Sequence, residues 1–383
     1  MVGQDTPPLS DEQIRDAFSH PIGTPTIPEL AKGKQGRIVV TCDDLSRPTP
    51  ASRVFPFIMQ ELHEAGIRDD QIFILGSFGC HHPMNHDAFV RKVGKEMVAK
   101  YDCVNHNPFC NFKSFGRTSR GTPLSVNEEF ALADLRITVS GIKKHRWAAA
   151  GGGGKAIIPG VASEDTILWN HSITQSREGR AIWRVKDNPE RSDMQEAARM
   201  AQLDVSINCN YNGKRELIGL HLGDSDEAWL QAVRMGYKMH AAPSVKEKAD
   251  IVIVNAYPQA DQGIDWSGAQ ESLREGGTAV AIHHFTLGRA HLHYRGERMN
   301  TQWRRLRGYP GKRWPVKQAN NVLIFSDKLS RSHILDYDDR VEWATSWDVI
   351  IDKLQTLHGD EARVAVYPCG KIQFDPNNYP LVI

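Results

Sequence analysis

The feature that most constrains the fold is an alternation of short β-branched apolar runs with longer segments of helical periodicity. Residues 36–42 (GRIVVTC) predict a buried strand, and residues 54–66 have helical spacing that ends at Gly66, a favoured residue at helix C-termini. Strand-like runs follow at 71–79 and 133–141. Such alternation predicts βαβ units and a parallel sheet that binds ligands at the C-terminal ends of its strands.

The same pattern restarts near residue 248, after a segment (160–245) that we interpret as mainly helical. Four later runs predict strands and two predict helices; the strands are 249–258, 278–285, 320–327 and 362–368, and the helices are 266–277 and 347–359. We therefore predict an α/β protein of two domains, 1–245 and the smaller 246–383, each with a mainly parallel sheet flanked by helices. The active site is expected in the cleft between them, and the last residues are able to pack back on the first domain.

Length, charge and cysteine usage narrow the functional classes. A chain of 383 residues fits two domains of ordinary size, and 47 Lys plus Arg against 46 Asp plus Glu give no net field to attract nucleic acid or an anionic membrane. No apolar segment approaches the ~20 residues that span a bilayer, and the N-terminus lacks the pattern of a secretory signal. The six cysteines form no CxxC pair, so we expect reduced thiols in the cytoplasm.

The turn TCDDLSRPTP (41–50) follows the first predicted strand. It would present backbone N–H groups and a helix N-terminus to an anion, and Arg47 adds a bidentate donor. The adjacent carboxylates of Asp43 and Asp44 are suited to ribose hydroxyls. A simple capped helix entry has a similar sequence, so the turn alone leaves both interpretations open.

The segment GSFGCHHPMNH (76–86) leaves the next strand and carries three histidines. His81 and His82 lie where an α/β fold builds its site, and imidazole titrates near neutral pH, which favours an acid/base role. Zinc binding by these two with His86 is the alternative. It is disfavoured because adjacent histidines in an extended turn point in different directions, and no cysteine or carboxylate completes a familiar ligand spacing.

The stretch HRWAAAGGGGKAIIPG (145–160) places one lysine inside a run of small residues. A phosphate loop needs Ser or Thr after the lysine, whereas Ala156 follows Lys155 and Pro159 would break the expected helix. We interpret the stretch as backbone stripped of side chains around a single amine, with room for a bulky group. A Schiff base of Lys155 with pyridoxal phosphate or a carbonyl substrate is an alternative.

Together these residues resemble the nickel-pincer-nucleotide-dependent lactate racemase (LarA-type) family of 2-hydroxyacid racemases and epimerases. The likeness rests on four elements in one order, and it extends over most of the chain. They are DDxxRPTP at 43–50, GxHxP at 79–83, the His145–Lys155–PG stretch, and His171 sixteen residues after the lysine.

The resemblance implies a covalently bound nickel cofactor, a pyridinium-3-thioamide-5-thiocarboxylate mononucleotide. Lys155 would form its thioamide link beside Gly153 and Gly154, and His171 would ligate the nickel within the cofactor-binding domain 1–245. The ribose-phosphate end or the substrate carboxylate would be held by Asp44, Arg47 and Thr49. Enzymes of cofactor biosynthesis are then expected partners, and the oligomeric state stays open.

The resemblance also implies the reaction, which is racemisation of a small, short-chain aliphatic 2-hydroxy acid. A hydride moves reversibly to the cofactor, and His81 and His145 act as acid/base groups on opposite sides of the substrate. The family pattern aromatic-Gln-x-x-Lys in the second domain is matched here only by WSGAQ (266–270), which lacks the lysine. Arg47, Trp266, Ser267 and Gln270 are the expected substrate contacts.

Several alternatives stay open at this point. The same cofactor could serve an epimerase of a larger sugar acid or a dicarboxylic hydroxyacid. From other classes, the chain could be a non-catalytic module that binds a nucleotide or sugar acid, or a zinc hydrolase. A second histidine-rich segment could also form a metal site; its histidines are His283, His284, His291 and His293.

Overall fold

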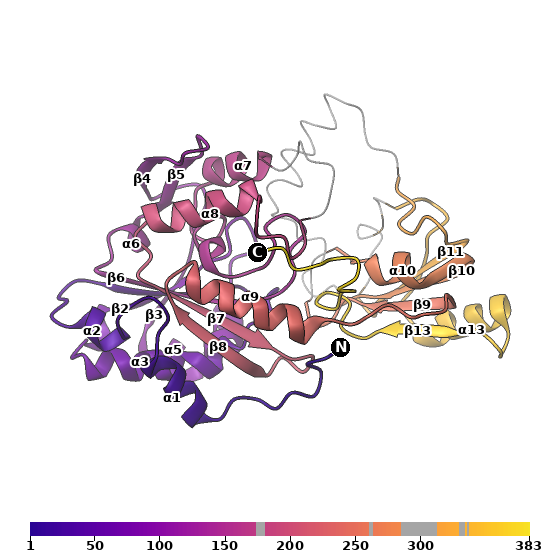
Figure 1. The fold of residues 1–383 in the computed structure, drawn as a ribbon, viewed down its shortest axis with the longest axis horizontal. Helices are drawn as coiled ribbons and strands as arrows, with labels where there is room; N and C mark the ends of the chain where they lie inside the picture. Colours follow the sequence, from indigo (N-terminus) through magenta and orange to yellow (C-terminus); the bar gives the residue numbers. More distant parts are fainter. Residues whose placement is uncertain (174–180, 260–262, 285–311, 329–333, 335–336) are drawn as a thin grey trace. The chain divides into compact units, whose positions relative to one another are not determined.

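The computed structural model describes residues 1–173, 181–259, 263–284, 312–328, 334 and 337–383. The chain forms two compact units (Figure 1). One consists of Gly3–Met239 with Pro380–Ile383, and the other of Met1–Val2 with the described residues of 240–379. Within the described residues, no helix has the length and apolarity needed to cross a bilayer.

A six-stranded sheet forms the centre of the larger unit. Its strand order is β3-β2-β1-β6-β7-β8, and only the β7–β8 pair is antiparallel. This confirms the predicted α/β class and the three strands predicted at 36–42, 71–79 and 133–141. The bounds are β1 (Ile38–Cys42), β2 (Ile72–Gly76), β3 (Asp102–Asn105), β6 (Leu135–Gly141), β7 (Val205–Tyr211) and β8 (Leu217–Gly223).

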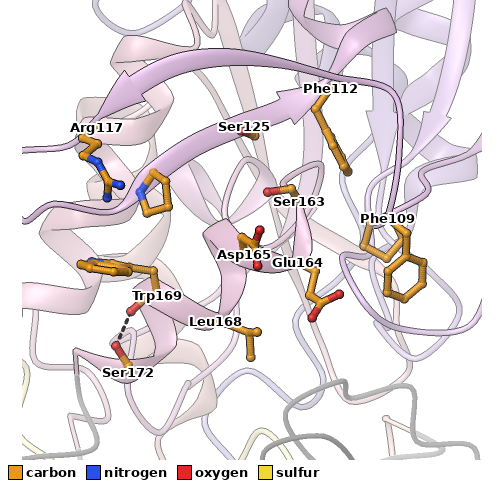
Figure 2. A pocket seen from close by; sticks show the side chains of 12 residues that line it. Phe109, Phe112, Arg117, Ser125, Ser163, Glu164, Asp165, Leu168, Trp169 and Ser172 are labelled. Carbon is orange, nitrogen blue, oxygen red and sulfur yellow. Dashed lines mark hydrogen bonds between the residues drawn. The ribbon is translucent and has the colours of Figure 1, made fainter.

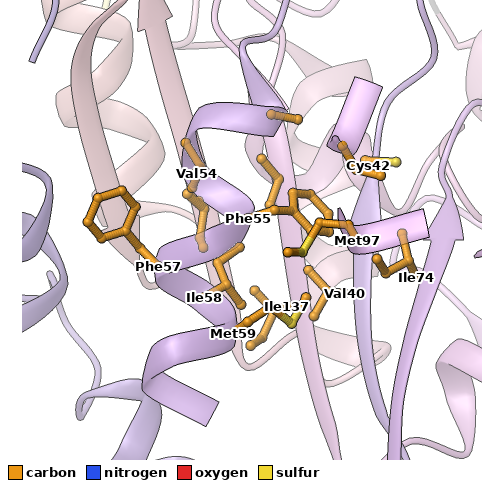
Figure 3. Packing of buried hydrophobic residues seen from close by; sticks show 14 of the residues in the cluster. Val40, Cys42, Val54, Phe55, Phe57, Ile58, Met59, Ile74, Met97 and Ile137 are labelled. Carbon is orange, nitrogen blue, oxygen red and sulfur yellow. The ribbon is translucent and has the colours of Figure 1, made fainter. Parts of the chain in front are cut away.

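Buried side chains cover both faces of this sheet, as the apolar run in β1 predicts for a central parallel strand. Ile38, Val40 and Cys42 belong to one core, where Val40 and Cys42 lie near α3 residues such as Phe55 and Ile58 (Figure 3). Val39 points into a second core on the opposite face, since side chains alternate along a strand. The helices of this unit are α1 (Asp11–Ser19), α2 (Ile27–Ala31), α3 (Ala51–Glu64), α4 (His86–Val93), α5 (Lys95–Lys100), α6 (Glu128–Ala131), α7 (Glu164–Ser172), α8 (Pro189–Met200) and α9 (Glu227–His240).

The prediction that residues 160–245 are mainly helical is wrong for β7 and β8, which form an antiparallel pair at the sheet edge. The error arises because β7 contains Asn208 and Asn210, polar residues that interrupt the apolar pattern of a strand. Both are fully buried. Their amides are hydrogen-bonded, with Nδ2 of Asn210 donating to the carbonyl of Ala232 at 2.9 Å and Oδ1 of Asn208 accepting from the N–H of Gly153 at 3.0 Å. Tertiary hydrogen bonds thus stabilise a strand whose sequence resembles a loop.

The smaller unit contains a five-stranded parallel sheet of order β12-β11-β10-β9-β13. The helix predicted at 266–277 ends at Ser272, and residues from Leu273 onward enter β10 through a register shift. Gly276 has a φ of +76° there, which a helix does not allow. The bounds are β9 (Ala249–Asn255), α10 (Ser267–Ser272), β10 (Leu273–Ile282), β11 (Asn321–Phe325), β12 (Glu342–Ala344), α13 (Trp347–His358) and β13 (Val364–Tyr367).

Candidate active site

A cavity of about 60 Å³ lies at the C-terminal ends of β1, β2 and β6, where a parallel sheet is expected to bind ligands. The turn after β1, the turn after β2 and the segment from Lys143 to Gly160 supply its walls. Five of the residues predicted from sequence line it together: Asp44, Arg47, His81, His145 and Lys155. We call the turns after β1 and β2 the carboxylate wall and residues 143–160 the backbone wall.

Internal hydrogen bonds fix the turn after β1. Oδ1 of Asp44 accepts from the N–H of Ser46 at 2.6 Å. Thr49, a predicted cofactor contact, is absent from the residues that line the cavity, and its hydroxyl donates to Oδ2 of Asp43 at 2.5 Å. Thr49 therefore stabilises the turn through its hydrogen bond to Asp43 and does not line the cavity.

Lys92 of α4 is a buried cation that sequence reasoning missed. Its Nζ forms an ion pair with Asp43 and donates to the carbonyls of Asp44 at 3.1 Å and Arg47 at 3.0 Å. The signal was present, because Lys92 shares the apolar helix face of Ala88 and Val93, where a lysine needs buried acceptors. Lys92 thus fixes the turn that carries Asp44 and Arg47.

His81 is oriented by a carboxylate. Its Nδ1 lies 2.6 Å from Oδ2 of Asp44, and a carboxylate only accepts, so Nδ1 carries a proton and the neutral ring keeps its lone pair on Nε2. Burial lowers the pKa of His81, although the charge of Asp44 opposes this shift. Burial alone would raise the pKa of Asp44, but His81, Arg47 and Ser46 hold it well below its usual range. The pair therefore consists of a neutral His81 imidazole and an ionised Asp44 carboxylate that orients it.

His145 is oriented by backbone donors instead. Its Nδ1 accepts from the N–H groups of Ala148 at 3.0 Å and Trp147 at 3.4 Å, so the neutral ring carries its proton on Nε2. Burial lowers the pKa of His145 well below its ordinary value, and the charge of Lys155 adds to the effect. In this arrangement His145 is a neutral hydrogen-bond donor at Nε2.

The glycine run packs against protein and leaves no side-chain space on the Cβ side, while the backbone of Gly151 and Gly152 lines the cavity. A Cβ on Gly152 would lie 2.6 Å from Oδ1 of Asn208, and one on Gly154 would lie 2.4 Å from the carbonyl oxygen of Met194. Gly152 and Gly153 also have φ angles of +77° and +54°. Gly153 and Gly154, predicted to contact the cofactor, are absent from the cavity lining.

Lys155 lies in a 3-10 turn, η2 (Gly153–Ala156), and reaches the cavity. Burial, and then the charges of Arg47 and Arg191, lower the pKa of Lys155 to about 7, against an opposing effect of Glu190. The fully buried Arg191 donates to the carbonyl of Gly152 at 3.0 Å and stacks 3.5 Å from the ring centroid of Trp229. Sequence reasoning missed Arg191. A large part of the Lys155 amine is thus neutral, and nucleophilic, at neutral pH.

His171 lies in the last turn of α7 with 8% of its surface exposed. It is absent from the cavity lining, but its charge contributes to the lowered pKa of His145. Trp266, Ser267 and Gln270 belong to the smaller unit. There Nε1 of Trp266 lies 3.5 Å from the hydroxyl of Tyr337, and Gln270 donates to the carbonyl of Pro315 at 3.1 Å. Their contact with substrate stays a prediction.

Among the described residues, the other histidines form no metal-binding group. Across the described part of the chain, no three His, Cys, Asp or Glu side chains are grouped to hold a metal ion, so the zinc alternative with His81, His82 and His86 gains no support. His283 is buried and His284 is exposed beside Asp327. His291 and His293 lie outside the described residues.

A larger hollow of about 720 Å³ lies between α7 and the hairpin of β4 (Phe112–Arg117) and β5 (Pro123–Asn127) (Figure 2). Arg117 stacks there over Trp169, with its guanidinium carbon 5.5 Å from the ring centroid. None of the described residues lining it is a histidine, cysteine or lysine. We therefore place the candidate active site in the smaller cavity.

Comparison with known proteins adds independent information. Residues 4–182 match the family described as "Lactate racemase N-terminal domain". The chain is 28% identical over 389 residues to a lactate racemase of Lactiplantibacillus plantarum, covering 94% of this chain and 89% of the relative. It is 28% identical over 283 residues to a lactate racemase of Thermoanaerobacterium thermosaccharolyticum, covering 71% of this chain and 65% of the relative.

Solved structures share the fold. The lactate racemase apoprotein from Thermoanaerobacterium thermosaccharolyticum superposes with a TM-score of 0.72 at 22% identity, covering 94% of this chain and 91% of that one. A protein from Thermotoga maritima has a TM-score of 0.69 at 17% identity, covering 98% and 99%. At these identities the likeness shows the α/β fold over most of the chain.

Proposed function

We propose that this chain is an isomerase of the LarA-type lactate racemase family and inverts the hydroxyl-bearing carbon of a small 2-hydroxy acid. The observation that carries the proposal is the meeting of Arg47, His81, His145 and Lys155 in one cavity. They come from three segments far apart in sequence. An anion-binding guanidinium, two imidazoles and a nucleophilic amine are the groups that this chemistry needs.

The nickel-pincer nucleotide implied by the sequence resemblance fits these residues. Lys155 supplies an amine whose pKa is lowered to about 7, as a covalent link requires, and the buried His171 supplies an imidazole for nickel. Arg47 and Lys143 line the cavity with positive charge for an anion. When bound, this group would supply the hydride acceptor for the substrate carbon. Ligand pockets usually measure about 300–1,000 Å³, so a mononucleotide would extend beyond this partly open cavity of about 60 Å³.

Side chains of the protein would transfer the hydroxyl proton of the substrate and bind its carboxylate. His81 would accept the hydroxyl proton at Nε2, and Asp44 would stabilise the imidazolium that forms, a contribution of roughly 10²–10⁴ in rate for a positioned base. His145 would donate from Nε2 to a substrate oxygen. Arg47 would pair with the carboxylate. For His145 to act as the second base, the N–H groups of Trp147 and Ala148 would have to leave Nδ1.

A short-chain aliphatic substrate is proposed over a sugar acid because Trp266, an expected substrate contact, would offer it an apolar wall. A cytoplasmic location belongs to the same proposal, since the six cysteines are scattered along the sequence and form no CxxC pair. The non-catalytic binding module is the alternative from another class. It requires neither a neutral lysine nor paired imidazoles.

The test uses protein from cells that make the pincer cofactor. Intact-mass and peptide analysis should find an adduct on Lys155 together with bound nickel, and chiral chromatography should show inversion of one or more 2-hydroxy acids. Lys155→Ala should lose all three, whereas Lys32→Ala, at an exposed lysine at the end of α2, should keep them. If wild-type protein from these cells carried no adduct and showed no turnover, the binding module would be supported instead.

A further inference from the structure

We propose that Asp193, acting through the side-chain amide of Asn170, fixes the tautomer and ring orientation of His171. The buried chain of hydrogen bonds keeps the proton of His171 on Nδ1 and a lone pair on Nε2. Asp193 is thus a positioning residue for the imidazole that we propose as the nickel ligand. The functional meaning of this inference rests on the proposed function, but the tautomer itself does not.

Three buried side chains from two helices make the connection. Nδ1 of His171 lies 3.2 Å from Oδ1 of Asn170, both in the last turn of α7. Nδ2 of Asn170 donates to Oδ2 of Asp193 on α8 at 2.7 Å and lies 3.4 Å from the carbonyl oxygen of Glu190. Asn170 and Asp193 are fully buried, so water cannot replace either partner.

The polarity of this chain follows from which groups can donate. A carboxylate and a backbone carbonyl only accept, so Asn170 must direct its NH₂ group toward Asp193 and Glu190. Its oxygen then faces His171, and an amide oxygen also only accepts. Nδ1 of His171 must therefore be the donor, which leaves the lone pair of the neutral ring on Nε2.

Asp193 is itself held as an acceptor. The hydroxyls of Thr118 and Thr122, at either end of the turn between β4 and β5, donate to it at 2.5 Å and 2.8 Å. With Asn170, three donors converge on two carboxylate oxygens. A buried carboxylate is costly unless it is fully hydrogen-bonded, and an isosteric amide here would present an NH₂ group to a donor. The negative charge of Asp193 therefore sets which group donates and which accepts in each of these hydrogen bonds, including the one between Asn170 and His171.

Such support is a general requirement of metal-binding imidazoles. The partner of the second ring nitrogen fixes the tautomer and orientation, and its loss typically costs about 10–100-fold in metal affinity. His81 and His171 both have a protonated Nδ1, but the first donates directly to a carboxylate and the second donates through an amide.

The decisive variant is Asp193→Asn, studied first in the apoprotein. Its NH₂ group displaces one of the three donors, and Asn170 can respond by turning so that Nδ2 donates to Nδ1 of His171. The proton then moves to Nε2. Nitrogen-15 NMR of histidine-labelled protein, with His171 assigned by loss of its signal in His171→Gln, should show Nδ1–H in the wild type and a shift toward Nε2–H in the variant.

Two further variants keep the test decisive if Asp193→Asn does not fold. The double variant Asn170→Asp with Asp193→Asn exchanges the two groups and should restore Nδ1–H. In it the carboxylate introduced at position 170 accepts from His171, and the amide introduced at position 193 donates to that carboxylate. Asn170→Leu should release His171 from a single tautomer. Asp204→Asn, at a partly buried carboxylate that accepts from Arg136, is the matched control and should leave His171 unchanged.

The outcomes separate this inference from the proposed function. Suppose that nickel affinity falls about 10–100-fold in loaded Asp193→Asn and is restored in the double variant Asn170→Asp with Asp193→Asn. This result supports both the positioning role and the proposed function. A wild-type Nδ1–H tautomer that responds to Asp193→Asn, in a protein that binds no nickel, supports the positioning role and contradicts the function. An unchanged His171 tautomer in folded Asp193→Asn or Asn170→Leu overturns the inference, whatever their stability.

Discussion

The two walls of the cavity hold equivalent-looking histidines in opposite ways. On the carboxylate wall, His81 donates from Nδ1 to Asp44; on the backbone wall, His145 accepts at Nδ1 from the N–H groups of Trp147 and Ala148. The first ring therefore keeps a lone pair on Nε2 and the second keeps a proton there. The group bonded to Nδ1, which no short motif specifies, therefore decides whether the neutral ring accepts or donates a hydrogen bond at Nε2.

The largest expected effect contrasts the two rings directly. His81→Gln should lower kcat of loaded enzyme by about 10²–10⁴ because a glutamine cannot take the hydroxyl proton. His145→Gln should lose less, since its amide still donates a hydrogen bond. Racemisation rates from both enantiomers measure this. Losses of kcat of the same size in His81→Gln and His145→Gln would show that His145 also serves as a base and that the backbone wall rearranges during turnover.

A second substitution breaks the carboxylate wall alone. Asp44→Asn should reduce kcat by roughly ten- to hundredfold, because a hydrogen bond to a charged group contributes about 1.5–3 kcal/mol. The pH at which His81 protonates should also fall, since Asp44 opposes the lowering of that pKa. Histidine NMR in the apoprotein separates this shift from any effect on folding. An unchanged His81 titration would remove Asp44 from the explanation.

A third prediction concerns Lys155 on the backbone wall. Its pKa of about 7 means that acylation of the apoprotein should rise through pH 7 instead of near 10.5. Arg191→Met should move this midpoint upward, because the charge of Arg191 lowers the pKa. Competitive acylation followed by peptide mass spectrometry gives the profile, with the Lys32 peptide as internal reference. A profile unaffected by Arg191→Met would assign the lowered pKa to burial and Arg47 alone.

The same lowered pKa has a consequence for stability. Between pH 7 and about 10.5 the unfolded chain binds a proton at Lys155 that the folded chain lacks, so the free energy of unfolding should rise with pH in this window. In Lys155→Met this increment should be absent. Urea unfolding of both apoproteins at pH 7 and pH 9.5 measures it, and parallel changes in the two would contradict the assignment.

The smallest effect tests the packing of the backbone wall. Gly154→Ala should lower the free energy of unfolding by about 1–3 kcal/mol, because its Cβ would lie 2.4 Å from the carbonyl oxygen of Met194. Gly263→Ala is the control, since none of the described atoms lies within 4 Å of its added Cβ. Similar denaturation midpoints for the two would mean that the backbone wall tolerates a side chain at position 154.

The amino-acid sequence was sufficient to predict the α/β class and most strands, because buried parallel strands need continuous apolar runs that few other structures explain. It also located His81, His145 and Lys155, since each lies in a distinctive local run. The strand β7 is explained only by the folded chain, in which Oδ1 of Asn208 accepts from the N–H of Gly153 and Nδ2 of Asn210 donates to the carbonyl of Ala232. The roles of Lys92, Arg191 and Asp193 also depend on the folded chain, because each bonds to partners distant in sequence, such as Arg47, Gly152 and Thr118 respectively. Tautomers and lowered pKa values arise from such long-range contacts and from burial, and neither exists before the chain folds.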